Sequence, residues 1–151
     1  MRLTVIAVGK LRGGPIADLV ADYARRSPWP LSVREVEARR PGVDRREAEA
    51  DLLLAAVPEG ATVVALDERG AALDSAAFAA RLGDWREQGV REVAFLIGGA
   101  DGLAERARRR ADVALAFGPA TWPHLLVRAM LAEQLYRAQT ILSGHPYHRG
   151  G

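Results

Sequence analysis

The chain has 151 residues, of which 49% are hydrophobic and 26% charged, as is typical of one soluble globular domain. It contains no cysteine, which excludes disulfides, thiolate metal sites and a cysteine nucleophile. Its formal net charge of +2 is too small to argue for nucleic acid binding. All of the 21 basic residues except Lys10 are arginine, whose planar fork pairs with phosphate and stacks on bases. A GC-rich genome explains most of these arginines equally well.

The first half of the chain alternates between strand and helix patterns. The opening apolar run is too short for a signal peptide or a membrane span, so it predicts a strand and a cytoplasmic location. Asp44 and Glu47 have capping-box spacing, which predicts a helix start. The expected elements are a strand over 2–8, a helix over 15–26, a strand over 31–36, a helix over 44–57 and a strand over 61–66.

The second half continues the alternation. Asp74 is a candidate helix cap, and Gly89 ends the helix that follows. The expected elements are a helix over 74–88, a strand over 90–97, a helix over 103–110, a strand over 113–117, a helix over 124–142 and a tail over 143–151. Five strands alternating with five helices predict a single α/β domain over residues 1–151, with a mostly parallel sheet flanked by helices.

Three unusual loops follow strands of this sheet, over residues 66–70, 98–102 and 118–123. Ligands of open α/β sheets bind outside the carboxyl ends of the strands. The 98–102 and 118–123 loops follow consecutive strands, so together they outline a candidate cleft for a small cofactor. Gly98 and Gly99 alone would fit a tight turn equally well. The loop after the first strand, residues 9–14, matches neither the dinucleotide nor the nucleoside triphosphate glycine pattern.

The last helix is apolar on more than one face. A helix that covers one face of a sheet needs only one apolar stripe, so the excess indicates a second burial, most simply in a two-fold dimer. The alternative is a helix wholly buried in its own core. One face carries Leu126, Met130 and Leu135, and the other carries Val127, Leu131, Ala138 and Leu142.

All three histidines, His124, His145 and His148, lie near the carboxyl end. Zinc is one explanation, but there is no cysteine and no evident third ligand, so we expect no metal. Tyr147, His148 and Arg149 instead offer an aromatic plane, a proton acceptor and a phosphate-pairing fork, which suit an exposed nucleotide. A frayed terminus without a role is the alternative.

The order and spacing of short motifs along essentially the whole chain resemble the ribosomal RNA large subunit methyltransferase H family, which belongs to the SPOUT methyltransferases. Trp122 replaces a more usual Leu or Phe, and Leu125 a more usual Pro or Gln, without removing a functional group. The motifs are Ala7-Val8-Gly9-Lys10, Tyr23-Ala24-Arg25-Arg26, Leu66-Asp67, Leu96-Ile97-Gly98-Gly99 with Gly102, Thr121-Trp122-Pro123-His124, Val127-Arg128, Glu133 to Ala138, and His145-Pro146-Tyr147-His148-Arg149.

The resemblance implies a fold with a C-terminal trefoil knot whose loops wrap S-adenosylmethionine, the methyl donor. It also implies a homodimer in which the tail of one subunit completes the cofactor site of the other. By position, the implied cofactor residues are Leu66, Gly98, Phe117, Gly118, Pro119, Ala120, Thr121 and Trp122.

The implied reaction is methylation of N3 of a pseudouridine in helix 69 of 23S rRNA, on the assembled ribosome. The acceptor is a neutral imide N–H that must lose its proton, and His148, then His124, are the candidates to assist that loss. Arg149 and Arg128 are the candidates to stabilise the developing anion or to hold phosphate, beside Tyr147. The open alternatives are a SPOUT enzyme acting on another RNA such as tRNA, a non-catalytic RNA-binding factor, and a flavodoxin-like protein.

Overall fold

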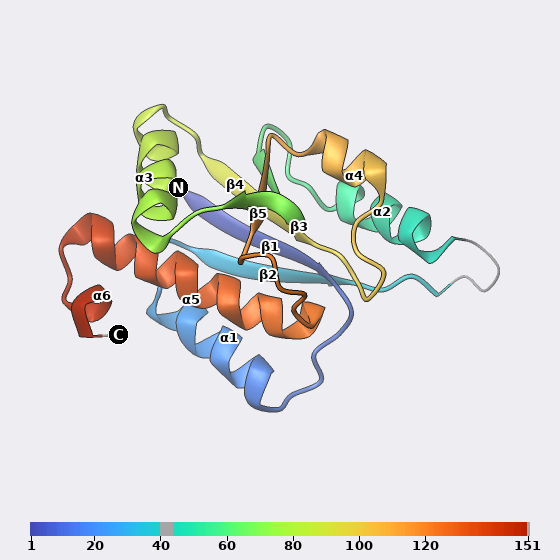
Figure 1. The fold of residues 1–151 in the computed structure, drawn as a ribbon, viewed down its shortest axis with the longest axis horizontal. Coiled ribbons are helices and arrows are strands. Elements are labelled where there is room, and N and C mark those ends of the chain that lie inside the picture. Colours follow the sequence, from blue (N-terminus) through green and yellow to red (C-terminus); the bar gives the residue numbers. More distant parts are fainter. Residues whose placement is uncertain (40–43, 151) are drawn as a thin grey trace.

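A five-stranded sheet in the order β2-β1-β4-β3-β5 forms the centre of the molecule (Figure 1). The computed structural model describes residues 1–39 and 44–150, so Gly151, the end of the expected tail, lies outside the described residues. The pairings between neighbouring strands are all parallel. The elements are β1 (Arg2–Val8), α1 (Pro15–Arg26), β2 (Leu31–Val36), α2 (Arg45–Ala55), β3 (Thr62–Ala72), α3 (Ser75–Glu87), β4 (Glu92–Ile97), α4 (Glu105–Arg110), β5 (Val113–Ala116), α5 (His124–Ser143) and α6 (Tyr147–Gly150).

The sheet separates two hydrophobic cores. Helices α1, α3 and α5 lie on one face and α2 and α4 on the other, as Figure 1 shows. Side chains alternate along β1, so that Leu3, Val5 and Ala7 pack on the α3 and α5 side. Ile6 and Val8 pack on the α2 and α4 side. Strands that are buried on both faces read as continuous apolar runs, which is why the sequence predicts them well.

The predicted α/β architecture is confirmed, with a sheet that is parallel throughout its described pairings. The two aspartate caps also form. The Asp44 carboxylate accepts from the Arg46 amide at 3.0 Å, and the Asp74 carboxylate accepts from the Ala77 amide at 2.7 Å. Glu47 does not complete the capping box, because its carboxylate is bonded instead to Arg106 at 2.7 Å.

The predicted end of β3 at Leu66 is wrong. Leu66 and Ala71 both pair with Leu115 of β5, so residues 67–70 bulge outward and pairing then resumes to Ala72. Gly70 makes this possible, since a Cβ there would lie 2.6 Å from the backbone of Ala114 and Leu115. The sequence pattern does not reveal this close contact of two backbones. The knot implied by the family resemblance stays a prediction.

The second apolar face of α5 is largely covered within the same chain. Helix α5 lies between α1 and α3 and packs against both (Figure 1). Leu131 and Leu135 are fully buried, whereas Leu126 and Met130 are half-buried and Leu142 is exposed. The apolar excess that predicts a dimer is therefore explained in good part by intrachain packing, and a smaller apolar surface remains beside α5.

Candidate active site

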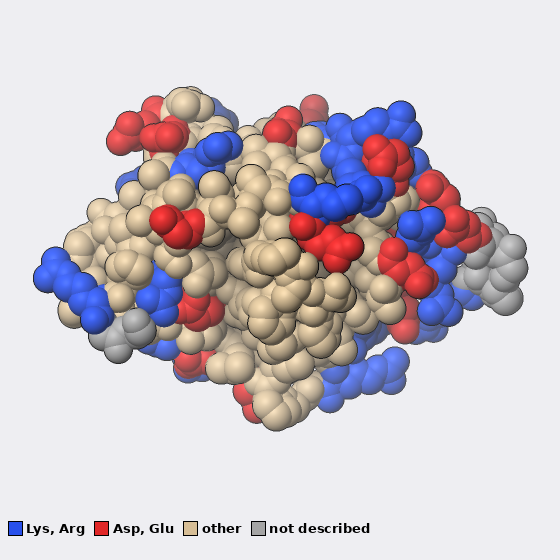
Figure 2. All heavy atoms as spheres, in the orientation of Figure 1, with Lys and Arg blue, Asp and Glu red and all other residues tan. Residues whose placement is uncertain are grey.

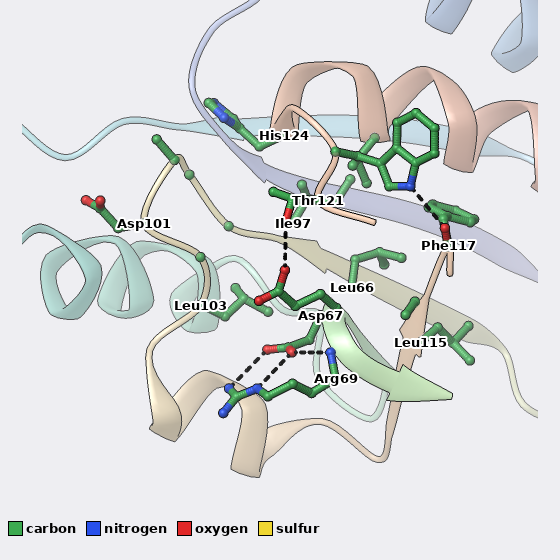
Figure 3. Close-up of a pocket in the computed structure, with 18 of the residues that line it drawn as sticks. Leu66, Asp67, Arg69, Ile97, Asp101, Leu103, Leu115, Phe117, Thr121 and His124 are labelled. Atoms are coloured by element: carbon green, nitrogen blue, oxygen red, sulfur yellow. Dashed lines mark hydrogen bonds and ion pairs between the residues drawn. The ribbon is translucent and has the colours of Figure 1, made fainter. Parts of the chain in front are cut away.

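A cavity of about 540 Å³ opens where the three predicted loops meet (Figure 3). The carboxyl end of β3, the β4–α4 loop and the β5–α5 loop form its walls, as the topology of a parallel sheet predicts. The structure therefore brings together most of the expected cofactor residues, while Pro119 lies outside the lining. Those that line the cavity are Leu66, Gly98, Phe117, Gly118, Ala120, Thr121 and Trp122.

Gly98 is required by the geometry of the β4–α4 loop. A Cβ at this position would lie 2.7 Å from the carbonyl carbon and oxygen of Gly102 and 2.9 Å from the Leu103 amide nitrogen. The backbone of Gly102 and Leu103 therefore packs directly against Gly98, and Gly102 reverses the direction of the chain with a φ of 77°. Gly98 therefore lines the cavity with its backbone alone, which a flat ligand can contact.

Asp67 is a nearly buried carboxylate at the cavity wall. It accepts from the Arg69 amide at 2.9 Å and from Arg69 Nε at 3.2 Å, and it lies 3.4 Å from Arg108 Nη1 (Figure 3). Partial burial raises the pKa of Asp67, but the hydrogen bonds from Arg69 and the charge of Arg108 outweigh it, so the pKa lies below its usual value. The carboxylate is therefore ionised at neutral pH and fixes the start of the 67–70 bulge.

Two contacts hold the β5–α5 loop over the cavity (Figure 3). Trp122 Nε1 donates to the Phe117 carbonyl at 3.0 Å, which closes the loop on itself. Thr121 Oγ1 donates to Glu68 at 3.3 Å, which joins the loop to the β3 bulge. The indole ring of Trp122 remains 43% exposed. The hydrogen bond therefore fixes the indole edge that carries Nε1, while the rest of the Trp122 side chain remains partly exposed to solvent.

His124 lines the cavity at the first turn of α5. Burial, followed by the positive charge of Arg128, lowers the pKa of His124 below its ordinary value of 6.5. The ring is therefore neutral at pH 7 and has a nitrogen able to accept a proton. A histidine next to a cofactor-sized cavity fits the expected role of His124.

Arg128 does not fit the expected contact with RNA. It is only 1% exposed, and its guanidinium donates to the Val8 carbonyl at 2.8 Å, the Gly9 carbonyl at 2.6 Å and Glu35 at 2.6 Å. Glu35 also accepts from the Leu11 amide at 2.6 Å. Arg128 therefore ties the start of α5 to the ends of β1 and β2, and its role is to position this part of the site.

We expect Glu35→Ala to lower the free energy of unfolding by about 3 kcal/mol, because it leaves the buried Arg128 without its anion. Urea denaturation measures this, with Glu37→Ala as the matched control. The Glu37 carboxylate pairs with the exposed Arg39, so its loss should cost less than about 1 kcal/mol. Equal losses in the two variants would contradict the structural role given to the Arg128 ion pair.

The same ion pair sets a pH dependence. Partial burial raises the pKa of Glu35, but the Leu11 amide and the Arg128 guanidinium outweigh it and hold the pKa below its ordinary value of 4.5. A carboxyl whose pKa is lower in the folded state stabilises the protein above its unfolded pKa. The contribution is therefore complete at neutral pH and is lost as the pH falls below 4.5 toward the folded-state pKa. The denaturation difference between wild type and Glu35→Ala should shrink over that range.

The carboxyl-terminal residues Tyr147, His148 and Arg149 lie away from the cavity of their own chain. They form the helical turn α6, which packs against α5. The His148 ring contacts Arg137, thirteen residues after His124 along α5, which corresponds to about 20 Å of helix. The structure therefore does not bring the predicted tail residues together with the predicted cofactor residues within one chain.

Several residues around these groups are absent from the prediction made from sequence. Simple sequence signals could have pointed to two of them, because Asp67 is a carboxylate at a predicted strand end and Arg108 lies in an arginine-rich helix. Glu133 and Arg137, which hold the tail, give no such signal, because charged residues one turn apart on a helix are usually solvent-exposed pairs. Within residues 1–39 and 44–150, no three metal-ligating side chains cluster. No helix in that part of the chain is long and apolar enough to cross a membrane.

Comparison with known proteins agrees with this geometry. Residues 1–148 match the family model described as a predicted SPOUT methyltransferase. A probable methylase family protein from Haemophilus influenzae has a similar fold, with a TM-score of 0.57 at 10% identity, covering 95% of this chain and 69% of that one. The SpoU methyltransferase AviRb from Streptomyces viridochromogenes, whose structure contains AdoMet, has a TM-score of 0.51 at 17% identity, covering 91% and 58%. The fold is that of a SPOUT methyltransferase, and the chain belongs to this class.

Sequence comparison narrows the class. The chain is 64% identical to ribosomal RNA large subunit methyltransferase H of Rhodospirillum centenum and 58% identical to that of Paramagnetospirillum magneticum. Both matches cover 99% of this chain and 99% of the relative. The chain belongs to the ribosomal RNA large subunit methyltransferase H family, a family of SPOUT methyltransferases that act on large-subunit rRNA.

Proposed function

We propose that this protein methylates N3 of the pseudouridine at position 1915, in helix 69 of 23S rRNA, on the assembled ribosome, with S-adenosylmethionine as the methyl donor. The observation that carries the proposal is the convergence of the three strand-end loops on one cavity next to His124. The family relationship supports an rRNA substrate.

The cavity fits the cofactor. Its volume of about 540 Å³ lies within the range of small-molecule sites. Leu66, Ile97 and Val127 supply an apolar wall for a flat ring, and Gly98 lets the 98–102 loop fold closely enough to form the neighbouring wall. The charged groups that line it are balanced, with the carboxylates of Asp67, Glu68 and Asp101 and the guanidinium groups of Arg46, Arg69 and Arg108. When bound, S-adenosylmethionine supplies a sulfonium methyl group that is already activated for transfer.

The residues of the chain then act mainly by positioning and by handling one proton. The imide N3–H is neutral at pH 7, so a proton must leave N3 as the new bond to carbon forms. His124 is neutral and lines the cavity, so it is placed to assist on the cofactor side. Arg149 supplies positive charge for the anion that develops on the base or for a phosphate. Tyr147 and His148 accompany Arg149 on the tail.

We further propose that the working unit is a homodimer in which the tail of one subunit completes the cavity of the other. The tail lies about 20 Å along α5 from its own cavity. A two-fold axis perpendicular to α5 reverses the partner helix and places each tail beside the other cavity. Figure 2 shows an area largely free of charged side chains over the first turns of α5, with acidic and basic side chains above it and to either side. Leu126 and Met130 in these turns are half-buried, and Trp122 just before them is exposed.

The direct test is mass spectrometry of 23S rRNA from a strain that lacks the gene. We expect N3-methylpseudouridine to disappear from helix 69 and to return when the wild-type gene is restored. An unchanged level in the deletion strain would reject the assignment and favour another RNA, such as tRNA. Calorimetric titration of the purified protein with S-adenosylmethionine separates the enzyme from a non-catalytic RNA-binding factor, which has no reason to bind the cofactor.

A further inference from the structure

The tail is anchored to α5 and α1 by the ring and hydroxyl of Tyr147. The hydroxyl lies 3.1 Å from Glu133 Oε1 and 3.2 Å from the Tyr23 hydroxyl. The ring meets Tyr136 edge-on at a centroid distance of 4.8 Å. Burial, followed by the contacts with Tyr23 and Glu133, raises the pKa of Tyr147, so the hydroxyl keeps its proton and donates to Glu133. Tyr147 therefore fixes the turn that carries the next residue, His148.

Arg137 is held in the same cluster. Its Nε donates to Glu133 Oε1 at 2.8 Å, and Nη2 lies 2.6 Å from the same oxygen. The guanidinium carbon lies 5.0 Å from the centroid of the Tyr147 ring. Its side chain is only 15% exposed. With Nε and Nη2 committed to Glu133, the remaining terminal nitrogen, Nη1, faces the tail and lies 3.2 Å from Nδ1 of His148.

This contact determines which ring nitrogen of His148 carries the proton. A guanidinium has five N–H donors and no acceptor, and it stays protonated in proteins. Nδ1 of His148 must therefore accept the hydrogen bond through its lone pair. A neutral imidazole whose Nδ1 accepts carries its hydrogen on Nε2. The outward-facing nitrogen of the ring is then a hydrogen-bond donor.

We propose that Arg137 is a positioning residue that holds His148 as its Nε2–H tautomer, so that the tail presents a donor, and not a base, to the methyl acceptor. The inference deepens the proposed function and rests on the tail lying at the acceptor. It changes the expected role of His148, which as a base would need a free lone pair on Nε2.

The chemistry of the acceptor suits a donor at this position. The imide nitrogen lies between two carbonyl groups, so the negative charge that appears when N3 loses its proton spreads onto their oxygens. During the reaction the N3–H bond breaks and N3 forms its bond to the methyl carbon as the bond from that carbon to the sulfonium sulfur breaks, which leaves a neutral thioether. His148 keeps its proton throughout. The Nε2–H and the Arg149 guanidinium both stabilise the developing charge. The N3 proton goes to another acceptor, for which neutral His124 at the cavity is available.

The first test reads the tautomer without measuring activity. We would label the histidines of the full-length dimer with ¹⁵N and record long-range ¹H–¹⁵N spectra at neutral pH. We expect His148 to carry hydrogen on Nε2 in wild type and in Arg137→Lys, which keeps a donor. We expect Arg137→Met to lose the fixed tautomer. Hydrogen on Nδ1 in wild type, or spectra that are identical in Arg137→Met, would overturn the proposal.

The second test compares two replacements of His148 in single-turnover methylation of ribosomes. The Gln side chain places an N–H donor near the position of Nε2 but has no basic nitrogen, whereas Leu has neither. We expect His148→Gln to retain methylation within about tenfold of wild type and His148→Leu to lose about 100-fold. Equal loss in both variants would overturn the donor role.

The two tests separate this inference from the proposed function. Full activity of His148→Leu would reject the placement of the tail at the acceptor, and with it the donor role, but would leave the proposed methylation standing. A wild-type tautomer with hydrogen on Nδ1, together with an inactive His148→Leu, would reject the donor role alone. Restoration of both the Nε2–H signal and the rate in Arg137→Lys, relative to Arg137→Met, supports Arg137 as the residue that fixes the tautomer.

Discussion

Replacing Gly98 with alanine is expected to weaken S-adenosylmethionine binding by about tenfold to 100-fold. The added Cβ would lie 2.7 Å from the carbonyl carbon and oxygen of Gly102, which are backbone atoms that cannot rotate away. The 98–102 loop must therefore shift, and this loop is one wall of the cavity. Overpacking of this kind costs about 1–3 kcal/mol, which we expect to appear mainly as lost cofactor affinity, because the loop that must move is a wall of the cavity, and in part as lost stability.

Calorimetric titration with S-adenosylmethionine and thermal unfolding together measure both contributions. Gly83→Ala is the matched control, because it adds the same methyl group in α3. There the nearest atom, at 3.1 Å, is the end of the Leu142 side chain, which is 42% exposed and able to turn aside. We expect Gly83→Ala to bind cofactor as wild type does. Unchanged cofactor affinity in Gly98→Ala would contradict the assignment of this cavity.

Replacing Arg149 with alanine is expected to reduce methylation by about 100-fold while cofactor affinity stays nearly unchanged. Arg149 is exposed on the tail and lies outside the cavity lining of its own chain. Its expected partner is the RNA, through the charge that develops on the base or through a phosphate. Losing it removes stabilisation of the transition state and leaves the cofactor cavity intact.

Single-turnover methylation and calorimetry on the same preparation separate these two effects. Arg91→Ala is a suitable control, since it removes another exposed arginine just before β4, at the end of the sheet opposite the cavity. It should change neither quantity. Parallel loss of methylation and cofactor affinity in Arg149→Ala would contradict the placement of the tail on the RNA side.

The positions of the strands, and the loops that meet at the cavity, follow from local sequence signals. Each strand is a short apolar run, and the parallel topology brings the loops after β3, β4 and β5 to one edge of the sheet. The same reasoning fails where a contact between distant segments decides the structure. Gly70 looks like the end of a turn, yet it allows β3 to cross closely over Ala114 and Leu115.

The positions of Arg128 and of the tail were also beyond prediction from local sequence signals, because contacts with other segments determine them. An arginine on a helix is usually exposed, and only the Glu35 side chain and the carbonyls of Val8 and Gly9, all distant in sequence, explain why Arg128 is buried. The turn α6 is too short to produce a periodic pattern. Its position depends on Glu133, 14 residues before Tyr147, and on Tyr23, 124 residues before it.

Mixed dimers test directly the central claim that each tail completes the cavity of the partner subunit. One subunit carries Gly98→Ala, with a defective cavity and a normal tail, and the other carries Arg149→Ala, with a normal cavity and a defective tail. If the tail serves the partner, the purified heterodimer has one complete site. At an S-adenosylmethionine concentration near the wild-type Kd it should methylate at about half the wild-type rate, although each parent homodimer is much slower. A heterodimer as inactive as its parents would contradict the claim, because a tail that served its own cavity would leave no complete site.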